Sequence, residues 1–202
     1  MRKLLHKIIL SSILLAFLGC AAPHWTVVKN QTLKSNKLNL NISIPEGWFM
    51  FSNIGYNQCP ICFNNEISVL LTKDYYLLNY IVVSKLDTSK MLLPTKIKLD
   101  TTKTLLEIAN DYSNGLKELN FCKQRYHLDA LEFTDFLGRE GFKIKAHFNN
   151  PDGLPCILLV YGTIIDNILY TAKLFAPKYY YYYDILPSFK KFVSQLRYIN
   201  SH

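Results

Sequence analysis

The sequence of 202 residues lacks the short motifs that mark several common kinds of active site. It has no Gly-x-Ser-x-Gly, which positions a nucleophilic serine, and no His-Glu-x-x-His, which binds catalytic zinc. It has no glycine-rich loop of the kind that holds nucleotide phosphates, and no internal repeat. We therefore expect a protein that is not an enzyme and that has no cofactor and no metal site.

The chain also lacks a cluster of basic residues, although its formal net charge is +8. Lysine and arginine are scattered, and no run forms the stripe that would neutralise a phosphate backbone. This pattern argues against a nucleic-acid partner. A positive surface facing anionic lipid or envelope sugars is a weaker alternative, and an ordinary solvated surface is the simplest interpretation.

The main apolar run lies at the N-terminus and is too short to cross a membrane. Basic residues at positions 2, 3 and 7 precede Ile8–Leu18, which is apolar except for Ser11 and Ser12. This run has about eleven residues, whereas a transmembrane helix needs about 20. The pattern is typical of a signal peptide.

The end of this run, Phe17-Leu18-Gly19-Cys20, resembles the lipobox of bacterial lipoproteins, with Phe17 where leucine is commoner. The resemblance implies cleavage before Cys20 and acylation of its thiol and amine, and two or three acyl chains anchor a protein far better than one. A plain secretory signal and an uncut membrane helix are the alternatives. Ala21, rather than Asp, resembles lipoproteins sent to the outer membrane, facing the periplasm. We expect a signal peptide at 1–19, a lipid-anchored tether at 20–37 and one domain at 38–202.

Four cysteines remain beside Cys20, and in an oxidising periplasm this even number predicts disulfides without fixing their pairing. They are Cys59, Cys62, Cys122 and Cys156. The Cys59-Pro60-Ile61-Cys62 pattern could serve a thiol oxidoreductase, but that chemistry needs the first cysteine at a helix N-terminus. Residues 63–66 lead instead into a strand-like run, which favours a structural disulfide. A zinc site is a weaker alternative, because the second pair of cysteines is not closely spaced.

The hydrophobic periodicity predicts strands first and a helix near the middle of the chain. Leu38–Ile44 alternates and stops at Pro45, and two further runs at 67–71 and 77–83 predict a hairpin. Apolar residues then recur at helical spacing over 102–118, where Thr104 and Glu107 have the spacing of a capping box.

The second half predicts an antiparallel meander followed by a closing helix. Strand-like runs at 121–136, 142–148, 157–165 and 168–175 are separated by turn signals at 137–141, 149–153 and 166–167. The closing helix has Asp184 near its start, and Pro187 is tolerated only in its first turn. Its apolar face comprises Ile185, Phe189, Phe192, Val193 and Leu196. The fold class is α+β.

This order of elements resembles the PsbP-like α/β/α sandwich of DcrB-type lipoproteins, and in particular a family of short uncharacterised bacterial lipoproteins. The residues that carry the resemblance are Leu71-Thr72-Lys73-Asp74, Leu78-Asn79-Tyr80-Ile81, Gly138–Lys143, Leu169-Tyr170, Ala176-Pro177, Tyr182 and Leu186–Phe189. Tyr75 departs from the glycine that is common in that family. The resemblance implies fold and anchoring, within a superfamily of mostly accessory and binding proteins that share no catalytic site.

Aromatic and titratable residues supply the remaining candidates. The run of tyrosines at 179–183, with Tyr170 and Trp48, could bind a sugar or a partner protein, or alternate rings could pack beneath the closing helix. The run comprises Tyr179, Tyr180, Tyr181, Tyr182 and Tyr183. The histidines at 127 and 147 are interpreted as structural or surface residues. The acids at 129, 132, 135 and 140 lie near one hairpin, but Glu132 and Asp135 point to opposite faces of a strand, which argues against a glycosidase pair.

The functional expectation is a lipid-anchored envelope protein that acts as a non-catalytic accessory or binding module, with an envelope protein or a glycan as partner. The alternative is an envelope thiol-redox factor or enzyme that uses Cys59 and Cys62. A purely structural envelope component is the third hypothesis.

Overall fold

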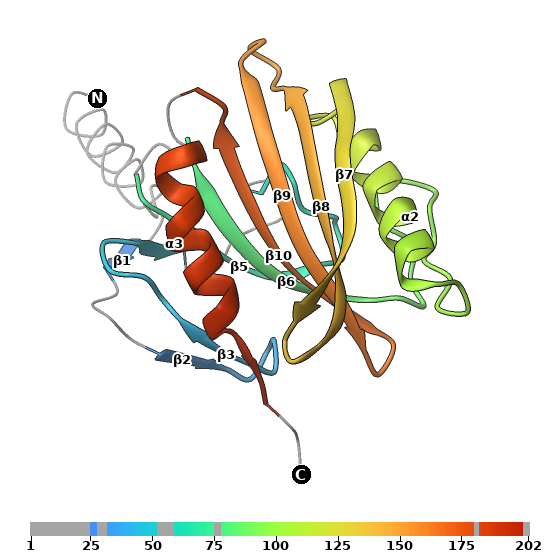
Figure 1. Cartoon of the computed structure of the whole chain (residues 1–202), viewed down its shortest axis with the longest axis horizontal. Coiled ribbons are helices and arrows are strands. Elements are labelled where there is room, and N and C mark those ends of the chain that lie inside the picture. The colour runs from blue at the N-terminus through green and yellow to red at the C-terminus, as the bar shows by residue number, and fades with distance from the viewer. Residues whose placement is uncertain (1–24, 28–31, 52–58, 75–77, 180–181, 200–202) are drawn as a thin grey trace, which may run out of the picture.

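The computed structural model describes residues 25–27, 32–51, 59–74, 78–179 and 182–199, and these form a central sheet with a helix on each face (Figure 1). The predicted signal peptide and Cys20 lie outside these residues. No helix in the described part of the chain combines the length and apolar character that crossing a bilayer requires.

The central sheet has eight strands, and every neighbouring pair is antiparallel. The predicted hairpin and the predicted meander are both confirmed, and the last strand of the meander pairs with β6 to join the two halves of the sheet. In spatial order the strands are β1 (Trp25–Val27), β4 (Phe49–Phe51), β5 (Ile67–Thr72), β6 (Tyr80–Asp87), β10 (Ile168–Pro177), β9 (Pro155–Ile165), β8 (Arg139–Asn149) and β7 (Gln124–Phe136).

A second, three-stranded sheet lies below α3 in Figure 1. It comprises β11 (Arg197–Tyr198), β3 (Leu40–Ser43) and β2 (Thr32–Ser35). β3 matches the strand predicted over 38–44. The segment predicted as a tether contributes β1 and β2, so its described residues belong to the folded domain. Leu33 of β2 packs against the apolar cluster beneath α3, which gives this strand a hydrophobic reason to join the sheet.

Two hydrophobic cores lie on opposite faces of the central sheet. Along β6, Tyr80 and Val82 belong to the cluster on the α2 side, whereas Ile81 and Val83 belong to the cluster on the α3 side. Because successive side chains of a strand point to opposite faces, a strand covered on both sides is apolar almost throughout. This is why the run at 157–165 is almost continuously apolar and occupies an inner strand.

Helix α2 (Leu105–Glu118) begins at the predicted capping box. The Thr104 backbone N–H donates to the Glu107 carboxylate at 2.9 Å, and the Glu107 N–H donates to the Thr104 hydroxyl at 3.4 Å. The helix starts three residues later than predicted, because a capping residue has extended rather than helical backbone angles.

Helix α3 (Tyr182–Gln195) buries the predicted apolar face against the other side of the sheet, except that Leu196 follows the helix end and is buried in the same cluster. Pro187 is the sixth residue of the helix as described, so the expectation that it lies in the first turn is wrong. A residue at 187 would normally donate its N–H to the carbonyl of Tyr183, and proline cannot. Tyr183 and Pro187 are both exposed, so the missing hydrogen bond lies on the solvent-facing side of the helix.

Two short turns determine the register of the meander. Leu137 and Gly138 have φ values of 55° and 74°, as the tight two-residue hairpin turn requires, and β8 therefore begins at Arg139 rather than at residue 142 as predicted. Asp166 and Asn167 form the predicted turn between β9 and β10 in the same conformation.

Candidate functional site

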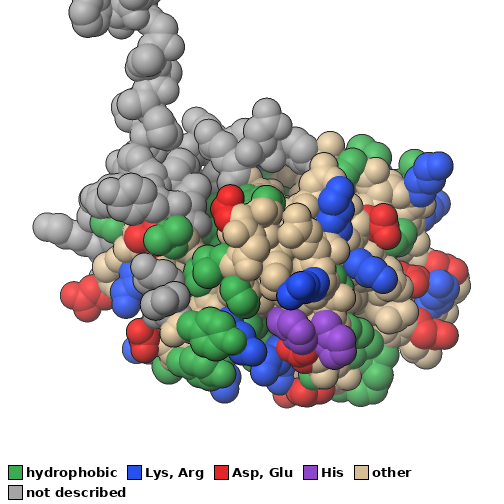
Figure 2. All heavy atoms as spheres, turned by 90° about the horizontal axis from the view of Figure 1, so that it is seen from above, with side chains coloured by type: hydrophobic (Ala, Val, Ile, Leu, Met, Phe, Trp, Pro, Cys, Tyr) green, Lys and Arg blue, Asp and Glu red, His purple; other side chains and the backbone are tan. Residues whose placement is uncertain are grey.

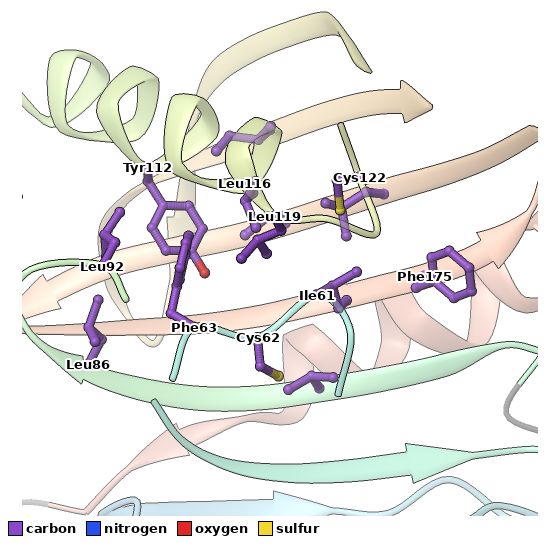
Figure 3. Close-up of a cluster of buried hydrophobic side chains, with 14 of the residues drawn as sticks. Ile61, Cys62, Phe63, Leu86, Leu92, Tyr112, Leu116, Leu119, Cys122 and Phe175 are labelled. Carbon is purple, nitrogen blue, oxygen red and sulfur yellow. The ribbon is translucent and has the colours of Figure 1, made fainter. Parts of the chain in front are cut away.

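The Cys59–Cys62 segment forms a disulfide-closed loop over the α2 face of the sheet. Figure 3 shows Ile61, Cys62 and Phe63 of this loop among the side chains of the core. The two bonded cysteines are 4% and 8% exposed, and the chain continues into β5 without a helix. The loop therefore lacks the helix N-terminus that would activate a redox cysteine.

A buried ion pair connects this loop to the sheet. The ammonium of Lys173, in the middle of β10, donates to the two carboxylate oxygens of Glu66 at 2.8 and 2.6 Å and to the Ile61 carbonyl at 3.1 Å. The side chains of Lys173 and Glu66 are 0% and 1% exposed, and Tyr112 donates its hydroxyl to Glu66 at 3.0 Å. Burial lowers the pKa of Lys173, and the Glu66 carboxylate opposes this change. The arrangement satisfies each buried charge and holds the loop against β10.

Sequence reasoning missed this pair, although one signal was available. Lys173 is the one charged residue of the inner strand β10 and stands at a position that faces the core. A lysine in that place needs a buried partner. The sequence does not identify the partner, because Glu66 is 107 residues away.

The remaining described cysteines, Cys122 and Cys156, are free and buried in the same core as the loop. Of the pairings left open by the sequence, the structure forms Cys59–Cys62 and leaves this second pair as thiols. Burial raises the pKa of Cys122 to about 12 and that of Cys156 to about 11. A redox or metal-binding cysteine needs the opposite change, a lowered thiol pKa. These thiols have the environment of structural residues.

We expect Cys122 and Cys156 to resist alkylation while the protein is folded. In the full chain carrying Cys20→Ser, iodoacetamide at pH 8 should modify both thiols at least about 100-fold more slowly than in denaturant, because little thiolate forms at the raised pKa values. Mass spectrometry of timed samples measures the rates. Labelling of the folded chain at the rate of a free cysteine would contradict the structural assignment and revive the redox alternative.

The tyrosine run divides between core and surface. Tyr182 is 4% exposed and belongs to the α3-side core, whereas Tyr179 and Tyr183 are 69% and 67% exposed. Tyr180 and Tyr181 lie outside the described residues. Thus the structure supports packing beneath the helix for one ring and a solvent-facing position for two others. Trp48 and Tyr170, which were grouped with this run, are buried core residues.

The acidic residues near the β7–β8 hairpin are spread along it. The Glu132 carboxylate accepts from Lys143 at 2.7 Å, and this contact lowers the Glu132 pKa. Asp135 and Glu140 lie opposite each other at the turn end. Asp129 has a different environment, because it contacts two histidines.

His127, Asp129 and His147 form a surface cluster that sequence reasoning treated as separate residues. His127 of β7 and His147 of β8 are cross-strand partners, and their rings are stacked with centroids 4.9 Å apart. Asp129 Oδ1 lies 3.1 Å from His127 Nδ1 and 2.6 Å from His147 Nδ1. Figure 2 shows the two histidines side by side on the surface, with acidic and basic side chains next to them. Among the described residues, His127, Asp129 and His147 are the set of three whose potential ligand atoms lie close enough to bind one metal ion.

A β-bulge in β7 creates this cluster. It adds Asp129 as an extra residue on β7, and beyond it His127 lies opposite His147. If the register of the hairpin turn continued without the bulge, Phe148 would lie opposite His127. The sequence shows that His127 and Asp129 are two residues apart on one predicted strand. It does not show that His147 lies beside them, because that depends on the bulge.

Comparison with known proteins identifies the fold. No protein-family model matches the chain, and no curated protein matches its sequence. The chain resembles the solution structure of cyanobacterial PsbP (CyanoP) from Synechocystis sp. PCC 6803, with a TM-score of 0.58 and 14% identity over 89% of this chain and 95% of that one. The predicted PsbP-like α+β sandwich is thereby confirmed.

Two further similarities are weaker. The Saccharomyces cerevisiae Ran-binding protein Mog1p gives a TM-score of 0.49 with 10% identity, over 85% of this chain and 96% of that one. LpqN, involved in cell envelope biogenesis of Mycobacterium tuberculosis, gives a TM-score of 0.49 with 10% identity, over 78% of this chain and 82% of that one.

Proposed function

We propose that the protein is a lipid-anchored accessory module of the bacterial cell envelope, facing the periplasm, which binds a partner and does not catalyse a reaction. The N-terminal sequence supports the anchor, because a basic start, a short apolar run and Phe17-Leu18-Gly19-Cys20 occur in the order of a lipoprotein signal. The environment of the described cysteines supports a structural rather than a redox role for them.

The exposed rings of Tyr179 and Tyr183 carry the binding part of the proposal. Both are more than two-thirds exposed, while Tyr182 between them is anchored in the core. The Tyr183 ring packs edge-on against Tyr182 with centroids 5.3 Å apart, and the Lys178 ammonium lies 5.5 Å from the Tyr179 ring centroid. Rings held in this way lose little freedom on binding, and tyrosine is typical of interface residues that contribute much of the affinity.

The partner is an envelope protein or an envelope glycan, since both offer faces on which a tyrosine ring can pack. Nucleic acid is not proposed, because the positive charges of the chain are scattered and the proposed location is outside the cytoplasm.

Membrane attachment tests the anchor. In cells fed with labelled palmitate, the wild-type chain should incorporate the label and remain in the membrane fraction, because its acyl chains bury their methylene groups in lipid. Cys20→Ser should lose the label and leave that fraction. Cys122→Ala is the matched control and should retain both properties. Unchanged labelling of Cys20→Ser would refute the anchor. The binding surface is tested separately, by crosslinking.

Site-specific photo-crosslinking tests the surface. A photoreactive amino acid at position 183 should form a discrete adduct in intact cells, whereas the same residue at Lys190, an exposed position later in α3, should not. Digestion of the adduct by protease or by glycan-cleaving enzymes distinguishes a protein from a glycan. In a second experiment the photoreactive amino acid stands at position 178, next to the exposed rings. There the double substitution Tyr179→Ala/Tyr183→Ala should reduce the yield of the adduct at least about tenfold. Equal adducts at 183 and 190 would contradict a localised surface.

A further inference from the structure

We propose that His127, Asp129 and His147 form a binding site for a borderline divalent transition-metal ion, with Zn²⁺ and Cu²⁺ as the candidates. This site is separate from the tyrosine surface and goes beyond the proposed binding function. Its support comes from the positions of three potential ligands, their place on paired strands, and their donor chemistry.

The three side chains already converge. Their potential ligand atoms lie within 4.8 Å of one another, and Asp129 Oδ1 is 3.1 and 2.6 Å from the two histidine Nδ1 atoms. Ligand atoms around tetrahedral zinc are about 3.3 Å apart, given zinc–ligand distances of about 2.0–2.2 Å. An ion at the centre therefore requires the two Asp129 contacts to lengthen by less than about 1 Å and any pair near the 4.8 Å limit to shorten by about 1.5 Å, shifts that rotation about side-chain bonds can supply.

The backbone beneath the cluster belongs to two paired strands. β7 and β8 form a long antiparallel pair, and the two histidines are directly opposite each other on it. Ligands placed on paired strands keep their geometry better than ligands on loops. The bulge that adds Asp129 is the local feature that brings a carboxylate to the same place as the two imidazoles.

The donor set selects a class of ion. Two imidazole nitrogens with one carboxylate oxygen suit zinc, copper and nickel, whereas magnesium and calcium prefer sites made of oxygen alone. Three protein ligands leave a fourth position for water or for a ligand atom from another molecule. The three side chains are 67%, 27% and 46% exposed in chain order, so an ion can reach them from solvent.

Calorimetric titration with ZnCl₂ tests the site on the full chain, purified in detergent with a tag that contains no histidine. We expect saturable binding of one ion per chain and no heat with MgCl₂. Asp129→Asn and His147→Gln should each weaken binding at least about tenfold, since even changes in the residues that support metal ligands cost 10–100-fold. His24→Gln is the matched control and should bind as wild type does.

Cobalt spectroscopy and thermal melting supply independent readouts. Co²⁺ bound by wild type should give visible d–d bands that disappear in His147→Gln, and Zn²⁺ should raise the melting temperature of wild type and of His24→Gln only. His127→Gln, at the most exposed position, provides a folded variant if another substitution destabilises the metal-free chain. Wild-type affinity in the folded ligand variants, or Zn²⁺ binding that falls equally in His24→Gln, would overturn the proposal.

Discussion

Replacement of Glu66 by glutamine is expected to lower the free energy of unfolding by about 3–5 kcal/mol, the usual cost of removing one partner from a buried ion pair. The substitution keeps the shape of the side chain but leaves the Lys173 ammonium, which is 0% exposed, without a counter-charge. Lys173→Met should be similarly damaging, because the buried Glu66 carboxylate then loses its counter-charge and keeps the hydrogen bond from the Tyr112 hydroxyl. Urea unfolding curves measure both changes.

The exposed pair on the neighbouring hairpin is a matched control for this prediction. Lys143 donates to Glu132 at 2.7 Å, a distance close to that of the buried pair, but the two side chains are 27% and 53% exposed. Glu132→Gln should therefore change stability far less than Glu66→Gln, because water already screens the exposed pair. The double variant Glu66→Gln/Lys173→Met should cost less than its two single variants together, since no isolated charge remains buried.

Two outcomes would contradict this account of the loop. Equal stability losses in Glu66→Gln and Glu132→Gln would mean that burial does not decide the strength of the contact. Strict additivity in the double variant would mean that the two charges do not act as a pair. If the prediction holds, the disulfide loop is held to the sheet by an electrostatic contact, and its cysteines serve the architecture of the α2-side core.

The second large effect is expected at Gly162 in β9. Gly162 lies opposite Phe142 of β8, whose ring covers it. A Cβ at 162 would overlap one carbon of this ring and would lie 2.7 and 2.8 Å from two other ring carbons. The Phe142 ring is 0% exposed and packs against Tyr112 at a centroid distance of 6.3 Å, so it has little room to move. Gly162→Ala should destabilise the fold by about 1–3 kcal/mol.

The competing effect of this substitution is smaller. Alanine restricts the unfolded chain more than glycine does, which stabilises a protein by about 0.4–1 kcal/mol where the backbone accepts it. We expect the steric overlap to outweigh that gain. Phe142→Leu removes most of the ring, so Gly162→Ala in that background should cost markedly less than in wild type, as measured by a double-mutant cycle in urea. The same cost in both backgrounds would mean that the ring is not the obstacle.

Local structure was largely predictable, because it depends on residues that are near one another in the sequence. The capping box at Thr104 and Glu107, the breaker at Pro45 and the turn at Asp166 and Asn167 all involve contacts within a few residues. The prediction failed where two local preferences competed. Pro187 disfavours a helix interior, yet the apolar face of α3 is buried around it and outweighs that preference.

The sequence by itself determined the hydrophobic pattern of the strands and helices, and hence the α+β class, because alternation and helical spacing are written along the chain. Only the tertiary structure decided which distant groups meet. It brought Lys173 to Glu66, formed one disulfide and left two thiols free, and placed His147 opposite His127 through one extra residue in β7. Such contacts depend on strand register and on loop paths, where a shift of one residue changes every neighbour.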